Sequence, residues 1–282
     1  MISFTSSGPR VSVSGLSVYL DNWAIGDLAE GDPSRRRRFI DALCTGEADL
    51  VFSVANAAEL TGAQGESRDS VKAFLDEIRL HWFPMELNVK EVLDREARGA
   101  DPGKSCVAEE FFAGYLAHRM KEYTPGAGRV IDPSEVFRLG AMLDWLGPQR
   151  ETIRKTSATL GDSLGNMICR YRAESERNPK WLDQTFPVTQ FNRLPPATFT
   201  YVNLVRALIE TKADRLKGND GLDFCHAVMG TAFSSFATLD KNWKRRVESL
   251  PPHRLAFVYN PLELDAMVTD IDLTLKRRAA RR

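Results

Sequence analysis

Short apolar runs alternate with amphipathic stretches near both ends of the chain. Runs rich in β-branched and aromatic residues predict strands at residues 16–20, 48–54, 235–239 and 253–259, with a further strand or strand end at 81–87. Helical spacing of apolar residues predicts helices at residues 22–31, 32–47, 55–62, 67–80, 219–232 and 240–250. Strands that alternate with helices are typical of a parallel sheet covered on both faces. The pattern therefore predicts an α/β fold with a mainly parallel sheet.

The middle of the chain lacks this alternation. Between residues 88 and 215 the pattern is helical only, and glycine- and proline-containing segments interrupt it at 99–105, 123–135, 146–148 and 186–199. We therefore expect a helical insertion within an α/β core. The resulting division of the chain is a first part of the core at 1–85, a helical insertion or subdomain at 86–215, and a second part of the core with a basic C-terminal tail at 216–282.

Composition narrows the class of protein. Hydrophobic residues make up 43% and charged residues 27% of the 282 positions, which is the balance of a globular domain, and the formal net charge is +0. The four cysteines are widely separated, which argues against a zinc site or a disulfide framework and suits a reducing compartment. No run approaches the roughly 18 apolar residues of a membrane-spanning helix, and the first residues lack the pattern of a signal peptide. We therefore expect a cytoplasmic protein without a membrane partner.

Acidic residues fall at or close to the carboxyl ends of the predicted strands. They are Asp21 and Asp240, each directly after a strand, Glu59 in the helix after the strand at 48–54, and Asp223 in the helix before the strand at 235–239. Asp220 lies three positions before Asp223, on the same helical face. Ligands of open α/β sheets bind beyond the carboxyl ends of the strands, so we expect one shared acidic site.

Gathered carboxylates repel one another and favour a hard divalent cation with oxygen ligands. One or two such ions can position a water molecule and stabilise an in-line attack on phosphorus. The four histidines and the unpaired cysteines favour Mg²⁺ or Mn²⁺ over zinc. A purely structural alternative stays open, in which Asp21 and Asp240 cap helices and Glu59 is a helix-start charge.

Basic residues cluster at 35–38, 241–246 and 276–282. Such clusters are commonly solvated surface, and we expect the last of them to be a disordered tail. The first two follow acidic residues of the expected site, so they could also contact phosphate groups. The candidates for that contact are Arg35, Arg38, Lys241 and Lys244.

Four short segments together resemble the PIN domain family of metal-dependent nucleases. They are VYLDNWAIGDL, VFSVANAAEL, NDGLDFCHAV and FATLDKNW, within residues 16–85 and 216–265. The residues that match the family's motifs are Asp21, Ser53 with Glu59, Asp223 with His226, and Thr238 with Asp240. Asn22 and Trp23 replace the more frequent Thr-Asn after the first acid, which leaves Asn22 and Ser53 as candidates to replace the missing hydroxyl.

The resemblance implies a PIN-like three-layer α/β/α fold and Mg²⁺- or Mn²⁺-dependent hydrolysis of phosphodiester bonds, with RNA as the commonest substrate. It implies that the metal ligands, which are also the catalytic residues, are Asp21, Glu59, Asp223 and Asp240. Asp220 is an alternative third acid, although the spacing and the neighbouring His-Ala favour Asp223. Hydrogen bonds from Asn22, Ser53 and Thr238 would hold these ligands in place.

The leading hypothesis is an endoribonuclease that acts as a toxin, in defence against phage, or in RNA processing. Its partners would be RNA and an antitoxin or regulatory protein, and a homodimer is a further hypothesis. The alternatives are a structure-specific DNA nuclease and a non-catalytic PIN-like scaffold that binds RNA or protein. A phosphatase of the haloacid dehalogenase type is excluded, because Trp23 stands where a second aspartate is needed.

Overall fold

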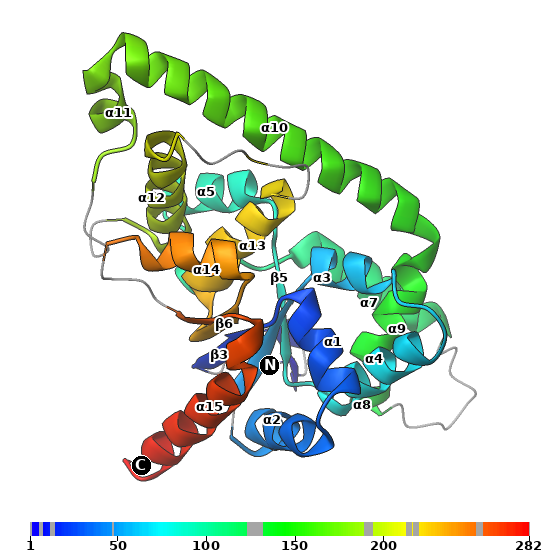
Figure 1. Cartoon of the computed structure of the whole chain (residues 1–282). Coiled ribbons are helices and arrows are strands. Elements are labelled where there is room, and N and C mark those ends of the chain that lie inside the picture. Colours follow the sequence, from blue (N-terminus) through cyan, green and yellow to red (C-terminus); the bar gives the residue numbers. More distant parts are fainter. Residues whose placement is uncertain are drawn as a thin grey trace.

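A five-stranded, all-parallel sheet forms the centre of the molecule (Figure 1). The computed structural model describes residues 2–5, 8–11, 15–46, 48–122, 132–188, 194–212, 216, 220–251 and 256–281. The strands of this sheet are β3 (Leu16–Tyr19), β4 (Ala48–Ser53), β5 (Trp82–Met85), β6 (Phe236–Thr238) and β7 (Phe257–Tyr259). The predicted α/β fold with a parallel sheet is therefore confirmed. The strand predicted at 253–259 is observed at its last three residues, and its first three lie outside the described residues.

The order of the strands places a topological switch point at the middle of the sheet. The order is β5-β4-β3-β6-β7, so the chain runs outward from β3 to β5 and later returns to the other side of β3. Tyr19 at the end of β3 is in register with Val51 of β4 on one side and with Ala237 of β6 on the other. Ligands of open α/β sheets bind at such a point, beyond the carboxyl ends of the strands. Asp21 and Asp240 follow the two strands that flank it.

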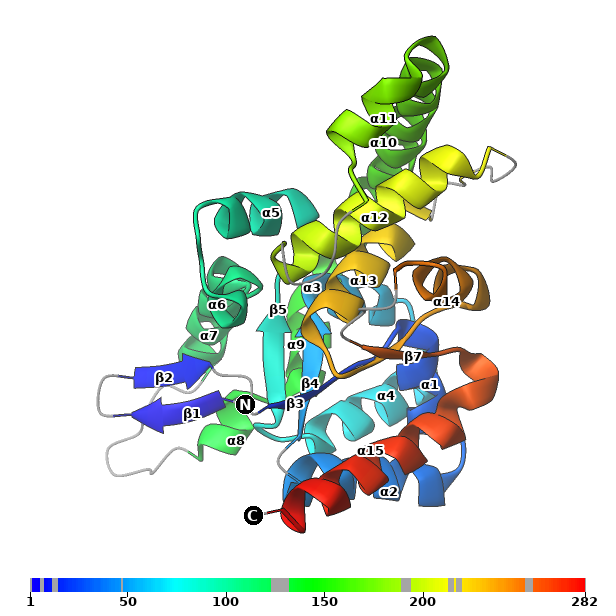
Figure 2. The same ribbon diagram turned by 90° about the vertical axis from the view of Figure 1, so that its left-hand side faces the viewer.

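Helices cover both faces of the sheet (Figure 2). Successive residues of a strand point to opposite faces, and accordingly Val18 and Tyr19 belong to two different hydrophobic cores. The first core contains buried residues of α1 (Asn22–Glu30), α2 (Pro33–Gly46), α4 (Gly65–Glu77) and α15 (Leu264–Ala279). The second contains those of α12 (Pro196–Glu210), α13 (Asp220–Phe233) and α14 (Lys241–Glu248).

Within its described residues the expected insertion consists of helices joined by turns and loops, and its Val107 forms one isolated bridge with Met85 of β5. Its elements are α5 (Val89–Ala97), α6 (Pro102–Ser105), α7 (Glu109–Glu122), α8 (Pro133–Val136), α9 (Leu139–Leu146), η1 (Gly147–Gln149), α10 (Arg150–Arg177), α11 (Pro179–Thr185) and α12. Buried residues of α7 and α9 join the first core, and those of α5, α10 and α12 join the second. The insertion is thus packed into both cores of the α/β fold. Parts of the predicted interruptions, at 123–131 and 189–193, lie outside the described residues.

Two terminal features differ from the sequence-based expectation. An antiparallel pair, β1 (Ile2–Thr5) and β2 (Gly8–Val11), precedes the main sheet and was not predicted. The expectation of a disordered basic tail is wrong for residues 276–281, because α15 continues to Ala279 and ends in a turn. Basic residues in the last turn of a helix are favoured by the helix dipole, and Arg278 also donates a hydrogen bond to the carbonyl of Gly15 at 2.8 Å.

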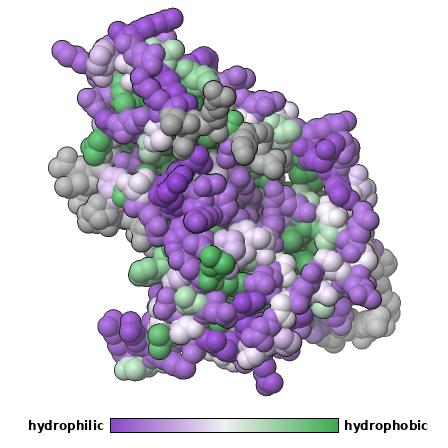
Figure 3. Space-filling view, viewed as in Figure 1, coloured by the Kyte–Doolittle hydropathy of each residue, from purple (hydrophilic) through white to green (hydrophobic). Residues whose placement is uncertain are grey.

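The surface seen in Figure 3 is mainly hydrophilic, with apolar residues scattered over it. None of the described helices is long and apolar enough to cross a membrane. Helix α10 runs along one side of the molecule, and its far end projects with α11 away from the sheet (Figures 1 and 2).

Candidate functional site

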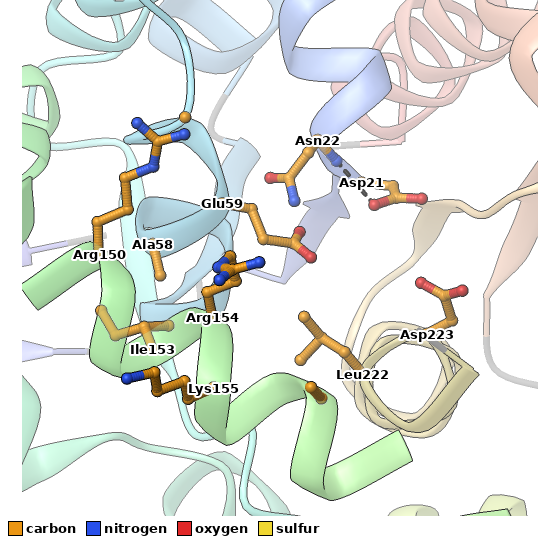
Figure 4. Close-up of a pocket in the computed structure, with 12 residues that line it drawn as sticks. Asp21, Asn22, Ala58, Glu59, Arg150, Ile153, Arg154, Lys155, Leu222 and Asp223 are labelled. Atoms are coloured by element: carbon orange, nitrogen blue, oxygen red, sulfur yellow. Dashed lines mark hydrogen bonds between the residues drawn. The ribbon is translucent and has the colours of Figure 1, made fainter. Parts of the chain in front are cut away.

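A pocket of about 610 Å³ opens beside the switch point of the sheet (Figure 4). Three of the predicted acids, which we call the acidic wall, line it: Asp21, Glu59 and Asp223. They come from the start of α1, from α3 (Val54–Leu60) and from α13. Residues far apart in the sequence therefore meet at one place, as expected for acids at the carboxyl edge of a parallel sheet.

The two acids that directly follow strands are also helix caps. Asp21 caps α1 and accepts a hydrogen bond from the backbone N–H of Asn22 at 2.8 Å. Asp240 caps α14 and accepts from the backbone N–H of Trp243 at 2.7 Å. The capping alternative is thus confirmed for both residues. It does not remove them from the site, because in each case the described cap bond uses one oxygen of the carboxylate.

Thr238 joins the two halves of the core at this point. Its hydroxyl accepts a hydrogen bond from the backbone N–H of Asp21 at 2.7 Å, which ties the end of β3 to the end of β6. Thr238 was expected to bond to a ligand carboxylate or to a metal-bound water, but its described side-chain bond goes to the backbone of Asp21. Asn22, also expected in a supporting role, lines the pocket and accepts a hydrogen bond from Asn56 at 3.4 Å.

Glu59 owes its position to the start of α3. Ser53 and Asn56 form a capping box, in which the Ser53 hydroxyl accepts from the backbone N–H of Asn56 and donates to its Oδ1 at 2.8 Å. Ser53 was expected to bond to a carboxylate, but its described side-chain bonds go to Asn56. It therefore fixes the helix that carries Glu59.

Asp223, and not Asp220, belongs to the acidic wall. Asp223 lines the main pocket with Asp21 and Glu59, and also a small cavity of about 10 Å³ that Asp240 borders. The Oδ1 atom of Asp220 lies 4.0 Å from Nη1 of Arg246, so its charge faces a cation. The geometry thus favours the interpretation that Asp223 is the third acid.

Burial and the charges of neighbouring acids raise the pKa of every member of the acidic wall. Burial and then the charge of Asp240 raise the pKa of Asp21 to about 6. Burial and the charges of Asp21 and Asp240 raise the pKa of Asp223 to about 7. Burial and the charges of Asp21 and Asp223 raise the pKa of Glu59 to about 8. The side chain of Glu59 is 38% exposed, and it lines the pocket. Within the described ranges no lysine or arginine forms an ion pair with these acids.

Neutral N–H groups from the core adjoin the acidic wall. The indoles of Trp23 and Trp243 lower the pKa of Asp21 and of Asp223, respectively, and their buried Nε1 atoms have no hydrogen-bond partner of normal geometry among the described residues. The buried Nε2 atom of His226 also lacks a partner there and lies 3.9 Å from Oε2 of Glu59. These neutral groups adjoin the carboxylates without cancelling their charge.

Three cations from the helical insertion line the other side of the pocket, and we call them the basic wall: Arg150, Arg154 and Lys155. Figure 4 shows Arg150 and Arg154 rising from α10, with Lys155 beside them pointing away from the acids. Arg154 pairs with Glu151 on the exposed helix surface at 2.9 Å, whereas Arg150 has no ion pair within the described part of the chain. These three residues were not predicted from the sequence. The spacing of Arg150 and Arg154, one helical turn apart, was the available signal.

A close helix crossing brings the basic wall next to the acidic wall. Helix α10 passes over α13 at Gly221, where a Cβ atom would lie 2.4 Å from the backbone nitrogen of Gly161. Only a residue without a side chain allows this approach. The crossing lies two positions from Asp223, so it sets the distance between α10 and the acids.

The basic residues predicted to contact phosphate lie elsewhere. Arg35 pairs with Asp27 at 2.8 Å and with Asp265 at 3.3 Å. Arg38 donates to Thr269 of α15 at 2.9 Å, and neither arginine lines the pocket. Lys241 and Lys244 line a separate pocket of about 300 Å³ beside α14, where Lys244 pairs with Glu248 and Glu263.

The acidic wall suits a hard divalent cation by its chemistry. Among the described residues no lysine or arginine pairs with these carboxylates, and burial and the repulsion between them raise the pKa values of Glu59 and Asp223. Carboxylate oxygens are the ligands that such a cation prefers. Within the described ranges, no three His, Cys, Asp or Glu side chains are close enough together to hold a metal ion as they stand. Binding would therefore require rotation of these side chains toward one another, and a bound cation would offset the repulsion between them.

We expect the metal-free protein to lose stability as the pH rises from about 5 to about 8. The folded state retains protons on the acidic wall that the unfolded chain releases near pH 4, so this contribution is complete below pH 4 and is lost as the pH passes the raised pKa values of about 6, 7 and 8. Thermal unfolding in EDTA across this range measures the effect. Asp223→Asn should show a shallower slope, and an unfolding temperature that is constant or rises in both proteins would contradict the expectation.

Comparison of the chain with models of protein families, with curated proteins and with solved structures found no match. No relative therefore supplies a function. The pocket and the residues that line it are the basis for the proposal that follows.

Proposed function

We propose that this chain is a metal-dependent nuclease with a PIN-like fold, and that it hydrolyses phosphodiester bonds of RNA as an endoribonuclease. The observation that carries the proposal is the pocket at the switch point of the sheet, with its acidic wall on one side and its basic wall on the other. Metal-dependent cleavage of a polyanion needs acids that hold the cation and basic residues that bind the phosphates. Helices on the two faces of a parallel sheet, and acids at its carboxyl edge, support a PIN-like three-layer arrangement.

The acids would hold the cation, with Asp21, Glu59 and Asp223 as ligands and Asp240 behind them at the small cavity. When bound, Mg²⁺ or Mn²⁺ supplies a more acidic water and neutralises charge on the phosphate that is attacked. The basic wall would bind the flanking phosphates and hold the strand across the acids. The helical insertion thus supplies the substrate contacts, and the α/β core supplies the acids.

The first test is cleavage of a mixed panel of RNA and DNA by the full chain with Mn²⁺, Mg²⁺ or EDTA, together with calorimetric titration of Mn²⁺. We expect RNA to be cut with either ion and not with EDTA. Cleavage that persists in EDTA would contradict the metal dependence, and cleavage of DNA alone would favour the DNA nuclease. If the chain binds no Mn²⁺ and cuts neither RNA nor DNA, the result favours a non-catalytic scaffold.

A further inference from the structure

A buried chain of hydrogen bonds leads from β4 to the acidic wall. It begins at Ser53, whose N–H and hydroxyl both donate to Oδ1 of Asn56, at 3.0 and 2.8 Å. These two bonds fix the orientation of the Asn56 amide, because its Oδ1 must face Ser53. The amide nitrogen therefore faces the other way. It donates to the carbonyl of Leu20 at 3.0 Å, and it shares its second hydrogen between Oδ1 of Asn22 at 3.4 Å and the hydroxyl of Tyr19 at 3.5 Å.

The Tyr19 hydroxyl transmits this orientation to His226. Because its oxygen accepts from Asn56, its single proton is available for Nδ1 of His226, with which it is in hydrogen-bond contact. Both side chains are buried, with 0% and 2% of their surface exposed. An Nδ1 atom that accepts from the tyrosine carries no proton of its own. A neutral ring that accepts at Nδ1 carries its hydrogen on Nε2.

The Nε2–H group of His226 then faces Glu59. It has no hydrogen-bond partner among the described residues, and Oε2 of Glu59 lies 3.9 Å away, beyond a normal hydrogen bond of about 3 Å. Glu59 in turn has no described hydrogen bond from its carboxylate, and 38% of its side chain is exposed to the pocket. A small rotation of Glu59 would satisfy the buried donor.

We propose that His226 is a positioning residue, which donates a hydrogen bond from Nε2 to Glu59 and holds that carboxylate in the orientation that binds a divalent cation. Ser53, Asn56 and Tyr19 fix the tautomer that makes this possible. The inference rests on the proposed function, because it concerns the same cation site. It assigns a purpose to a polar chain that crosses an otherwise apolar core, and it explains a buried donor without a partner.

The test compares Mn²⁺ affinity, by calorimetry, in wild type, Tyr19→Phe, His226→Leu and His226→Gln. Tyr19→Phe keeps the ring and removes the proton that fixes the tautomer, so we expect affinity to fall about 10-fold or more, as for other residues that orient ligands. His226→Leu should lose at least as much. His226→Gln, whose amide can again offer an N–H, should recover part of the loss.

Tyr115→Phe is the matched control, because Tyr115 is equally buried, lies in the other core, and donates its hydroxyl to the carbonyl of Arg138. It should lower thermal stability as Tyr19→Phe does, without changing Mn²⁺ affinity. A second measurement needs no metal: nitrogen NMR of the metal-free wild type should show His226 protonated on Nε2.

The outcomes separate this inference from the proposed function. The positioning role is supported if wild type binds Mn²⁺ and if Tyr19→Phe and His226→Leu bind it more weakly, while Tyr115→Phe binds it as wild type does. Equal binding in all variants, or a proton on Nδ1 of His226, overturns that role and leaves the nuclease proposal intact. Wild type that binds no Mn²⁺ overturns both.

Discussion

Asp223→Asn should reduce the proposed metal-dependent cleavage at least about 100-fold, because it removes one of the three carboxylates that would hold the cation. The same change should raise the unfolding temperature of the metal-free protein at pH 8 by a few degrees, since it removes the repulsion of Asp223 with Asp21 and with Glu59. Loss of function together with a gain of stability is typical of residues kept for a site. Cleavage assays and thermal unfolding of the same preparation check both parts.

Asp220→Asn provides the matched control on the same helix. Asp220 faces Arg246 in a partly buried setting, so its neutralisation should lower the unfolding temperature and leave Mn²⁺ affinity nearly unchanged. The two variants are thus expected to have opposite effects on stability and on metal binding. If Asp220→Asn abolished cleavage while Asp223→Asn retained it, the assignment of the third acid would be reversed.

The double variant Arg150→Gln and Arg154→Gln should weaken the binding of single-stranded RNA on the order of tenfold, because it removes two cations from the basic wall. The plot of log affinity against log salt concentration should become shallower by about 1.4, which corresponds to two phosphate contacts on a single strand. Fluorescence anisotropy at several salt concentrations measures both quantities. The experiment is done in the Asp223→Asn background, so that the RNA stays intact.

Arg35→Gln and Arg38→Gln form the corresponding control. These arginines contact Asp27, Asp265 and Thr269 between helices and lie outside the pocket. Their replacement should leave both the affinity and the salt dependence unchanged. If this pair weakened RNA binding and the α10 pair did not, the RNA path would run over α2, as the sequence first suggested.

The strands of the sheet and the acids near their carboxyl ends could be predicted from the local sequence. β3 and β4 are apolar runs whose positions follow from their composition, and an acid after a parallel strand is placed at the carboxyl edge by the geometry of the sheet. Asp21 and Glu59 could therefore be expected near Asp223 before any coordinates. The short antiparallel pair β1–β2 was missed, since four-residue strands carry too little periodic signal.

The second half of the site could not be predicted from local pattern. Arg150 and Arg154 look like ordinary charges on the exposed face of a long helix, and only the glycine crossing at Gly221 brings that helix over the acids. Likewise, Tyr19 and Asn56 have the sequence context of a strand residue and a helix-start residue. Their link to His226 depends on contacts across more than 200 positions. Periodicity describes neighbours along the chain, and these contacts are made between distant segments.

The order in which the sheet is assembled has a consequence for synthesis. β3 can pair with β4 early, but the bond from Asp21 to Thr238 spans 217 positions and waits for β6. Pairing over such a separation is slow, because a long loop must close before any contact is gained. A ribosome that adds about 5–20 residues per second exposes the first two acids well before the last two are made. The acidic wall is therefore incomplete during synthesis, and the site is assembled only when β6 has joined the sheet.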